Sequence, residues 1–531
     1  MPRSLALVVV LLLTTSGAMA ATTSPAASGP LAWRGTKMPK LRGLLFNQDS
    51  TDFFYSNAIT SDVDGGAVLD RYLDVLAEAG VTVLMCNTNA RKTDYRSGVW
   101  ESFWEGYDPA GPDDQPCLRP MLPDELPGYR RMMHSMMALD QQGVDYPARV
   151  IARCRERGIS PWISLRMNDV HCNDNLDHPF HGRLWRDPKY FRGGSGYFAR
   201  GLDYAHPEVR DLYRALVVET LQRYDLDGLE LDFMREPYLF RPGAEAAGAP
   251  ILHEWLRGIT RLVHDASVRR GHPIRLGVRV PSRVEVAQSW GLDAVAWARE
   301  GLVDLVVATP RWSTLEYDLA VDDWARALEG TGVTLAGGLE ILHRPLPGGP
   351  AGTVTREQAT GAATAVLAMG ADVVYLFNYF SPLAGDPAWT PEGYRRTLRA
   401  MSDLPVLAAL PRRHALTWRD IIGVGEQYQA PLPAAGTALT FALPTGPRPP
   451  QSAAVWLELR LAKPAASPPE VTVNGTPCAF HELVGVGGEL HRYAVPTTAL
   501  ADRARNAIVV RAADGEAVTV VGLEISITPA S

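Results

Sequence analysis

Near the middle of the 531-residue chain stands the stretch Asp227-Gly228-Leu229-Glu230-Leu231-Asp232-Phe233-Met234-Arg235-Glu236-Pro237. Its apolar residues alternate with Glu230 and Asp232, and a period of two residues is typical of a β-strand. One face of this strand would pack on helices, and the other would point both carboxyl groups into the protein. Buried carboxyl groups are costly unless they are paired or functional. The stretch therefore predicts a buried strand with a chemically active face.

Seven further apolar runs of similar length occur along the chain, and each is followed by an amphipathic helical pattern. We expect strands over 41–49, 81–89, 159–168, 226–233, 274–281, 303–309, 333–340 and 372–380, and helices over 66–80, 146–158, 207–224, 253–270, 293–300, 322–329, 356–369 and 391–401. Eight β-then-α units indicate an α/β protein with a (β/α)8 TIM barrel over residues 41–405. An open dinucleotide-binding sheet is less favoured, because no glycine-rich loop follows the first strand.

The two ends of the chain have a different character. Residues 1–20 contain Arg3, nine apolar residues and the sequence Ala18-Met19-Ala20, which is the pattern of a cleaved signal peptide. We therefore expect a secreted protein, extracellular or periplasmic, with a flexible leader over 21–40 and no membrane span in the mature chain. Residues 430–531 contain short strand patterns separated by Pro and Gly, and they predict an antiparallel β-sandwich, a galactose-binding-like accessory domain.

Composition excludes several classes of protein. The formal charge is −7 with no long like-charge block, which argues against nucleic acid and against a polybasic membrane binder as partners. The five cysteines are irregularly spaced and include no CxxC pair, so neither a zinc ribbon nor a thioredoxin-like motif is present. No motif calls for a cofactor, and nothing in the sequence indicates the oligomeric state.

The predicted strand ends carry an unusual number of polar side chains. Catalysis in a barrel of this kind takes place at the carboxyl ends of the strands. The leading catalytic candidates are Asp232 and Glu340, followed by Glu236, with Glu230 on the same face as Asp232. We expect the other polar side chains at these ends to bind substrate: Asn47, Asp49, Asn87, Asn89, Arg166, Asn168, His171, Arg279, Arg311, Trp312 and Asn378.

Paired carboxyl groups suit the cleavage of a glycosidic bond. One carboxylic acid protonates the leaving oxygen, and a second carboxylate acts as nucleophile or activates water. The sequence therefore favours a glycoside hydrolase whose substrate is a carbohydrate. Two other classes stay open: a non-catalytic carbohydrate-binding or cell-surface protein, and another barrel enzyme such as a polysaccharide lyase or a metal-dependent hydrolase.

Some residues have alternative interpretations. Arg166 with Glu230, or Arg279 with Asp232, could form a purely structural ion-pair layer. The histidine-rich loop from His171 to His181 could hold a metal or contact substrate, although its spacing matches no known metal motif. Four aromatic residues after the second strand could line sugar subsites or cover the barrel end: Trp100, Phe103, Trp104 and Tyr107.

The central stretch also resembles a known signature. Bacterial glycoside-hydrolase-like (β/α)8 proteins carry an Asp-Gly-(apolar)-x-x-Asp-(aromatic)-x-Arg-x-Pro run on their fourth strand. The matching residues here are Asp227, Gly228, Asp232, Phe233, Arg235 and Pro237. The resemblance implies that Asp232 is a nucleophile or a catalytic base.

Two positions depart from related barrels. Chitinase-type enzymes have Glu where this chain has Met234, which argues against substrate-assisted cleavage of chitin. Barrels with an Asn-Glu-Pro acid/base have Asn where this chain has Arg235, and under that alternative Glu236 would be the acid.

Overall fold

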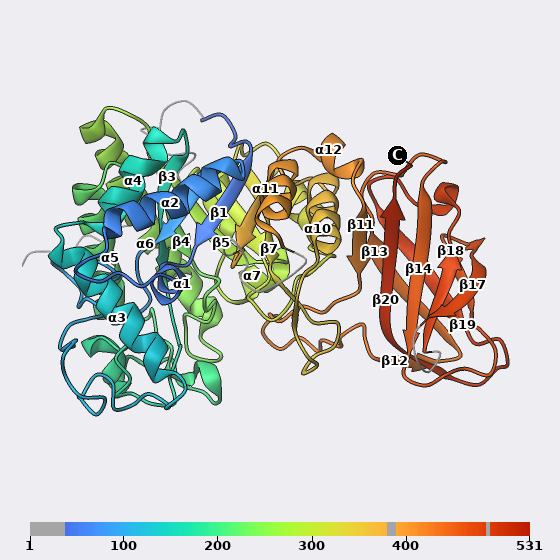
Figure 1. The fold of residues 1–531 in the computed structure, drawn as a ribbon, viewed down its shortest axis with the longest axis horizontal. Coiled ribbons are helices and arrows are strands. Elements are labelled where there is room, and N and C mark those ends of the chain that lie inside the picture. The colour runs from blue at the N-terminus through green and yellow to red at the C-terminus, as the bar shows by residue number, and fades with distance from the viewer. Residues whose placement is uncertain (1–37, 380–388, 485–488, 531) are drawn as a thin grey trace, which may run out of the picture.

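The computed structural model describes residues 38–379, 389–484 and 489–530. Eight parallel strands close into a barrel, in the order β1-β10-β7-β6-β5-β4-β3-β2 (Figure 1). They are β1 (Leu44–Gln48), β2 (Val81–Asn87), β3 (Ser160–Arg166), β4 (Gly228–Asp232), β5 (Arg275–Pro281), β6 (Leu305–Thr309), β7 (Thr334–Glu340) and β10 (Val373–Phe377). The predicted (β/α)8 barrel is confirmed. The predicted signal peptide lies outside the described residues, as does most of the leader.

Helices surround the barrel where the apolar periodicity predicts them. They are α2 (Gly65–Glu78), α4 (Tyr146–Glu156), α5 (Pro207–Arg223), α6 (Glu245–Arg270), α8 (Ala294–Glu300), α9 (Val321–Ala327), α10 (Arg356–Ala368) and α11 (Pro391–Ala400). The structure adds helices that the pattern did not predict, namely α1 (Ser50–Ser56), α3 (Leu126–Gln141), α7 (Val284–Ser289) and α12 (Leu404–Ala408). Helix α6 begins earlier than expected and includes Pro250.

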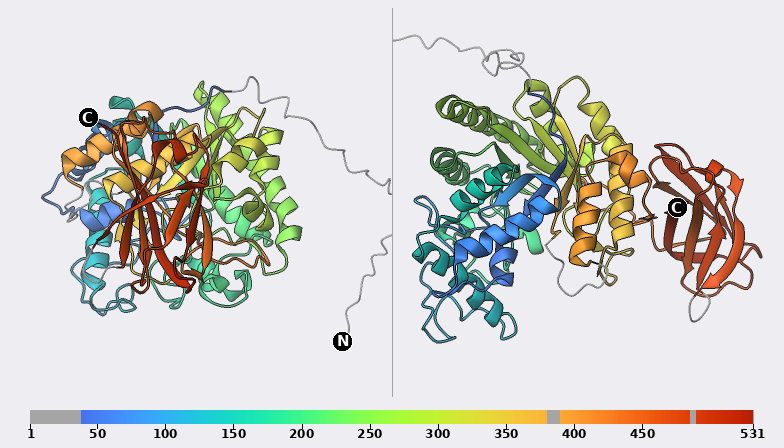
Figure 2. Two further views of the ribbon diagram at one scale, coloured as in Figure 1. Left: turned by 90° about the vertical axis from the view of Figure 1, so that its right-hand side faces the viewer. Right: turned by 45° about the horizontal axis from the view of Figure 1, so that its top comes forward.

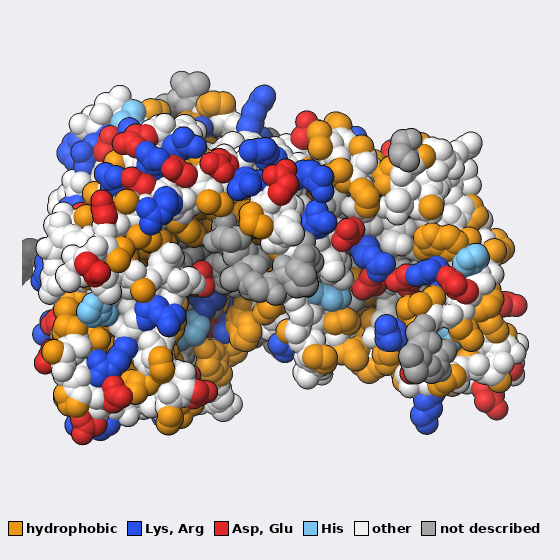
Figure 3. Space-filling view, in the orientation of Figure 1, with side chains coloured by type: hydrophobic (Ala, Val, Ile, Leu, Met, Phe, Trp, Pro, Cys, Tyr) orange, Lys and Arg blue, Asp and Glu red, His pale blue; other side chains and the backbone are white. Residues whose placement is uncertain are grey.

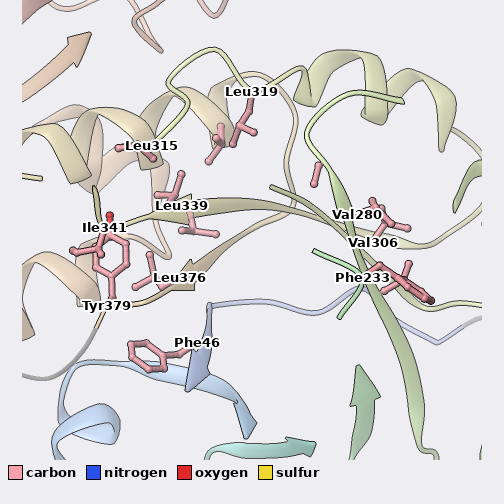
Figure 4. Close-up of a cluster of buried hydrophobic side chains, with 14 of the residues drawn as sticks. Phe46, Phe233, Val280, Val306, Leu315, Leu319, Leu339, Ile341, Leu376 and Tyr379 are labelled. Carbon is pink, nitrogen blue, oxygen red and sulfur yellow. The ribbon is translucent and has the colours of Figure 1, made fainter. Parts of the chain in front are cut away.

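Strand β4 has the alternation that its sequence predicts. Leu229, Leu231 and Phe233 belong to the large apolar core between strands and helices. Figure 4 draws Phe233 beside Val280 and Val306 of the neighbouring strands. Glu230 points to the other face, where it contacts side chains of strands across the barrel.

The glycine at the start of β4 is required by packing. A Cβ on Gly228 would lie 2.2 Å from the ring of Trp162, which fills the barrel interior with other large side chains. Any other residue would displace that ring. This contact gives a physical reason for the Asp-Gly pair at the start of the central stretch.

Two antiparallel sheets form the C-terminal part of the chain, as predicted. The first has the order β11-β20-β14-β18-β17 with β12 beside β20, and the second has the order β13-β19-β15-β16. The strands are β11 (Arg412–Ala415), β12 (Ala434–Gly436), β13 (Ala438–Pro444), β14 (Ala454–Leu461), β15 (Glu470–Val473), β16 (Thr476–Pro477), β17 (Ala479–Val484), β18 (Leu490–Ala494), β19 (Arg505–Arg511) and β20 (Val518–Thr528). β11 lies between residues 405 and 430, so the first sheet includes a strand from the stretch that the sequence assigned to neither domain.

The sandwich lies against one side of the barrel (Figure 2). A Cβ on Gly361 of α10 would lie 1.9 Å from the carbonyl oxygen of Arg413 in β11, so helix and strand backbones are in direct contact. Arg505 of β19 forms ion pairs with Asp318 and Asp322 of the barrel. Backbone packing and charge pairing therefore both join the two parts.

The surface charges are mixed (Figure 3), and the cysteines form no disulfide within the described residues. Figure 3 shows acidic and basic side chains interspersed over the barrel helices, with no extended area of one sign on that face. All five cysteines are free thiols. Within the described ranges, no helix combines the length and the apolar character needed to cross a membrane.

Candidate active site

The polar strand ends meet at one end of the barrel, around Arg279 of β5. Its Nη1 donates to Oδ2 of Asp232 at 3.0 Å, and its guanidinium lies 3.7 Å from the centre of the Phe377 ring. The backbone N–H of Met234 donates to the other oxygen of Asp232 at 2.8 Å. Both Asp232 oxygens therefore accept hydrogen bonds, and the carboxylate is held in one orientation.

Glu340 lies on β7, across the barrel from β4, and is completely buried. Its carboxyl group accepts hydrogen bonds from Nδ2 of Asn378 at 3.2 Å and from the N–H of Ile341 at 3.0 Å. Burial raises the pKa of Glu340 to about 8, against the opposing effects of Asn378 and Arg279. Near neutral pH this group is a carboxylic acid that can give up a proton. Asn378 has φ 61°, a strained conformation of the kind that clusters at functional sites.

Glu230 lies deeper in the barrel than Asp232. Its Oε2 accepts hydrogen bonds from Nδ2 of Asn47 at 3.2 Å and from the hydroxyl of Tyr375 at 3.1 Å. Burial and the neighbouring Asp232 raise the pKa of Glu230 to about 7. Glu230 is held in the barrel interior by side chains of β1 and β10, so it supports the site from below.

Glu236 and Arg311 form a bidentate pair after β4 and β6. Arg311 donates to the two Glu236 oxygens at 2.9 and 3.1 Å. Burial raises the pKa of Glu236 to about 7, although Arg311 opposes the shift. The same guanidinium lies over the rings of Tyr197, Phe198 and Trp312. Tyr197 is 47% exposed and Trp312 38% exposed, so two partly exposed aromatic rings lie beside this ion pair at the mouth of the barrel.

A second ionic network covers the ends of β1 and β3. Arg166 forms ion pairs with Asp49 at 2.7 Å and Asp169 at 3.4 Å. Burial opposes ionisation of Asp49, but Arg166 and Arg235 hold its pKa at about 2. Asp169 also accepts from Nδ1 of His171, whose Nε2 faces Nη2 of Arg235 at 2.7 Å.

Three predicted substrate-binding amides are engaged by backbone groups. Asn89 exchanges hydrogen bonds with both the N–H and the carbonyl of Arg166. Asn168 bonds both the N–H and the carbonyl of Leu202 and donates to the carbonyl of Tyr238. Asn87 donates to the carbonyls of Asn89 and Ser164. These side chains fix the end of β3, which bears Arg166, and the loop that follows it.

The structure also brings in groups that the sequence did not indicate. Asp420, in the connection between barrel and sandwich, accepts from the backbone N–H groups of Arg311 (3.0 Å), Trp312 (2.9 Å) and Ser313 (2.7 Å). The next residue, Ile421, packs with Met234 and Tyr238. The connection therefore forms part of the mouth. No local signal marks Asp420, because its partners lie more than 100 residues away.

The histidine side chains of the loop contact protein groups. His181 contacts the buried guanidinium of Arg91, and within residues 38–379, 389–484 and 489–530 no group of three or more His, Cys, Asp or Glu side chains could hold a metal ion. The four aromatic residues after β2 are buried, and two of them pack on other rings: Trp100 on Trp185, and Phe103 on Phe180. They form the core of the long insertion.

No family model and no curated protein matches the sequence. Among solved structures, α-L-fucosidase isoenzyme 2 from Paenibacillus thiaminolyticus is 13% identical with a TM-score of 0.39, covering 69% of this chain and 49% of its own. The PgaB (BpsB) glycoside hydrolase domain from Bordetella bronchiseptica is 11% identical with a TM-score of 0.38, covering 68% of this chain and 99% of its own.

A putative α-L-fucosidase from Bacteroides thetaiotaomicron is 11% identical with a TM-score of 0.33, covering 96% of this chain and 99% of its own. The chain thus spans about half the length of the Paenibacillus fucosidase. At these identities the likeness concerns the fold alone, and the chemistry must come from the residues described above.

Proposed function

We propose that the protein is a secreted glycoside hydrolase that acts on an oligo- or polysaccharide through Asp232 and Glu340. One observation carries the proposal: two carboxyl groups in different environments lie near one guanidinium at the catalytic end of a (β/α)8 barrel. Arg279 pairs with Asp232 at 3.0 Å, whereas burial raises the pKa of Glu340 to about 8. Glycosidic cleavage needs one ionised and one protonated carboxyl group.

The proposed reaction uses each group in the state that its surroundings favour. Glu340 donates its proton to the glycosidic oxygen as the bond to the leaving sugar breaks. The Asp232 carboxylate either attacks the anomeric carbon or takes a proton from the water that does so. The exposed faces of Tyr197 and Trp312 at the mouth are suited to stacking on sugar rings.

The test is hydrolysis of a broad glycan panel by the mature protein and its variants. Asp232→Asn and Glu340→Gln should each lower kcat/KM by roughly 10²–10⁴-fold with the fold intact. Asp227→Asn is the matched control on the same strand: its carboxylate lies at the opposite end of β4 and pairs with Arg155 and Ser160, so activity should persist.

The outcomes separate the competing functions. Wild-type turnover by either variant would remove that residue from the mechanism. Glycan binding without any product would favour a non-catalytic binding protein, and an unsaturated product that absorbs ultraviolet light would identify a lyase. Loss of activity on chelation would indicate a metal-dependent hydrolase.

A further inference from the structure

Arg235 is a buried cation at the mouth that contacts no carboxylate within residues 38–379, 389–484 and 489–530. Only 8% of the residue is exposed. Within the described residues its guanidinium makes one hydrogen bond, from Nη2 to His171, and its buried Nε has no partner there. Most buried guanidinium groups are paired, so this one requires an explanation.

The three neighbouring arginines provide an internal comparison. Arg166 lies 2.7 Å from Asp49, Arg279 lies 3.0 Å from Asp232, and Arg311 lies 2.9 Å from Glu236. Each therefore has its own carboxylate in contact. Arg235 contacts no carboxylate of the described residues. Arg91, after β2, lacks one as well, but its Nε, Nη1 and Nη2 all have partners, in the carbonyl of Asp169, His181 and Asn173.

The carboxylates nearest to Arg235 are already engaged. Asp49 and Asp169 both pair with Arg166, and Glu236 pairs with Arg311. His171 supplies no negative charge: Asp169 accepts from Nδ1, so Nε2 must be the unprotonated nitrogen that accepts from a guanidinium, which can only donate. The imidazole is thus neutral and orients Arg235 without neutralising it.

The surroundings make this charge costly in the free protein. Burial and the positive charge of Arg166 lower the pKa of Arg235, although three carboxylates act in the other direction. The guanidinium lies 5.9 Å from the centre of the Phe377 ring, and Arg279, the partner of Asp232, lies over the same ring. An anion beside Arg235 would offset the free-energy cost of burying the guanidinium. It would also lie next to Asp232, the proposed catalytic carboxylate.

We propose that Arg235 binds an anionic group of the substrate, namely the carboxylate of a uronic acid residue, so that the protein acts on an acidic glycan. This inference rests on the proposed function for its catalytic meaning, but binding tests it separately. The forked guanidinium suits a planar carboxylate, and a sulfate ester is the other anionic group that a polysaccharide could present.

The experiment is calorimetric titration of the full mature protein with matched oligosaccharides. Fragments of polygalacturonate, alginate and hyaluronan are each compared with their carboxyl-reduced neutral forms, and carrageenan fragments with their desulfated forms. At least one carboxylated oligosaccharide should bind tenfold or more tightly than its reduced form. Arg235→Gln should abolish that difference, Arg235→Lys should keep part of it, and Arg326→Gln on α9 should keep all of it.

Each result bears on the proposal. No preference for any carboxylated oligosaccharide, or a preference that survives in Arg235→Gln, would overturn it. A preference for the sulfated form alone would overturn the assignment to uronic acid. Arg235-dependent binding without hydrolysis would support this inference and reject the proposed function. Hydrolysis of neutral glycans only would support the proposed function and reject this inference.

A second measurement needs no ligand. If Arg235 lacks compensation in the free protein, Arg235→Gln should leave the melting temperature unchanged or raise it. Arg166→Gln should lower it, because Asp49 and Asp169 would lose their partner. A fall of similar size in both variants would show that Arg235 is a structural residue.

Discussion

Asp232 and Glu340 are both buried carboxyl groups, and their immediate neighbours support the different roles proposed for them. Asp232 accepts a charged hydrogen bond from Arg279, whereas the hydrogen bonds to Glu340 come from the neutral amide of Asn378 and from backbone N–H groups. A guanidinium stabilises a carboxylate far more than an amide does. The proposed assignment, with Asp232 as base or nucleophile and Glu340 as acid, therefore rests on Arg279 beside the first and Asn378 beside the second.

Glu340 should set the alkaline limit of activity. Its pKa of about 8 means that the proton is present at pH 7 and is lost as the pH rises past 8. The kcat/KM of the wild-type protein should accordingly fall above pH 8, and the residual activity of Glu340→Gln should lack that fall. Initial rates measured from pH 5 to 10 test this, and a wild-type profile that stays flat to pH 10 would rule out Glu340 as the acid.

The same residue predicts a trade-off with stability. The folded protein holds this proton more tightly than the unfolded chain does, since the pKa rises from 4.5 to about 8 on folding. Glu340 therefore costs stability progressively as the pH rises through that window. Urea unfolding should show Glu340→Gln more stable than wild type at pH 8.5, with the difference vanishing near pH 4, and the exposed Glu392→Gln should show neither effect.

At the level of elements, the sequence predicts strand identity and face because both follow from local alternation. Leu229, Leu231 and Phe233 pack outward, and Glu230 and Asp232 lie on the other face, as their period predicts. Arg279, Glu340 and Asn378 lie at the ends of their strands for the same reason. This part of the site can be predicted from the sequence because strand geometry is regular.

The remainder depends on long-range contacts that no local pattern encodes. Asn89 and Asn168 satisfy backbone groups of distant loops, which no side-chain type reveals in advance. β11 escaped prediction because its sequence Arg-Arg-His-Ala is charged, and its place depends on pairing with β20. Asp420 has partners that only the folded chain brings near.

Asp420 should act as a positioning residue for substrate binding. Its carboxylate fixes three consecutive N–H groups of the loop that carries Arg311 and Trp312. Losing such charge-assisted hydrogen bonds costs about 1.5–3 kcal/mol, so Asp420→Ala should raise KM roughly 10- to 100-fold. The kcat should change less, because Asp420 does not contact Asp232 or Glu340.

The matched control for this change is Asp64→Ala, which removes the helix-capping carboxylate of α2. It should cost about 1 kcal/mol of stability and leave KM unchanged. Steady-state kinetics and urea unfolding separate the two effects. If both variants lose stability and neither changes KM, the connection has no part in substrate binding.

For the whole molecule, the barrel and the sandwich form a coupled unit. Backbone atoms touch where α10 meets β11, Arg505 bridges to Asp318 and Asp322, and the connection between the two parts supplies Asp420 to the mouth. A change in how the sandwich docks should therefore reach the substrate-binding loop through residues 416–428. We therefore predict that the sandwich helps to position this loop.

Gly361→Ala tests this coupling directly. The new Cβ would lie 1.9 Å from the carbonyl oxygen of Arg413, so β11 must move away from α10. We expect a single calorimetric unfolding transition in the wild type and a lower or split transition in Gly361→Ala. We also expect a higher KM in Gly361→Ala, because the displaced connection releases Asp420.

Gly258→Ala in α6 is the control. Its new Cβ meets only the flexible end of Arg214, and alanine stabilises a helix by up to about 1 kcal/mol relative to glycine. A split transition with an unchanged KM would show that the sandwich docks on the barrel without influencing its mouth, and an unchanged single transition would show that the contact yields without separating the two parts.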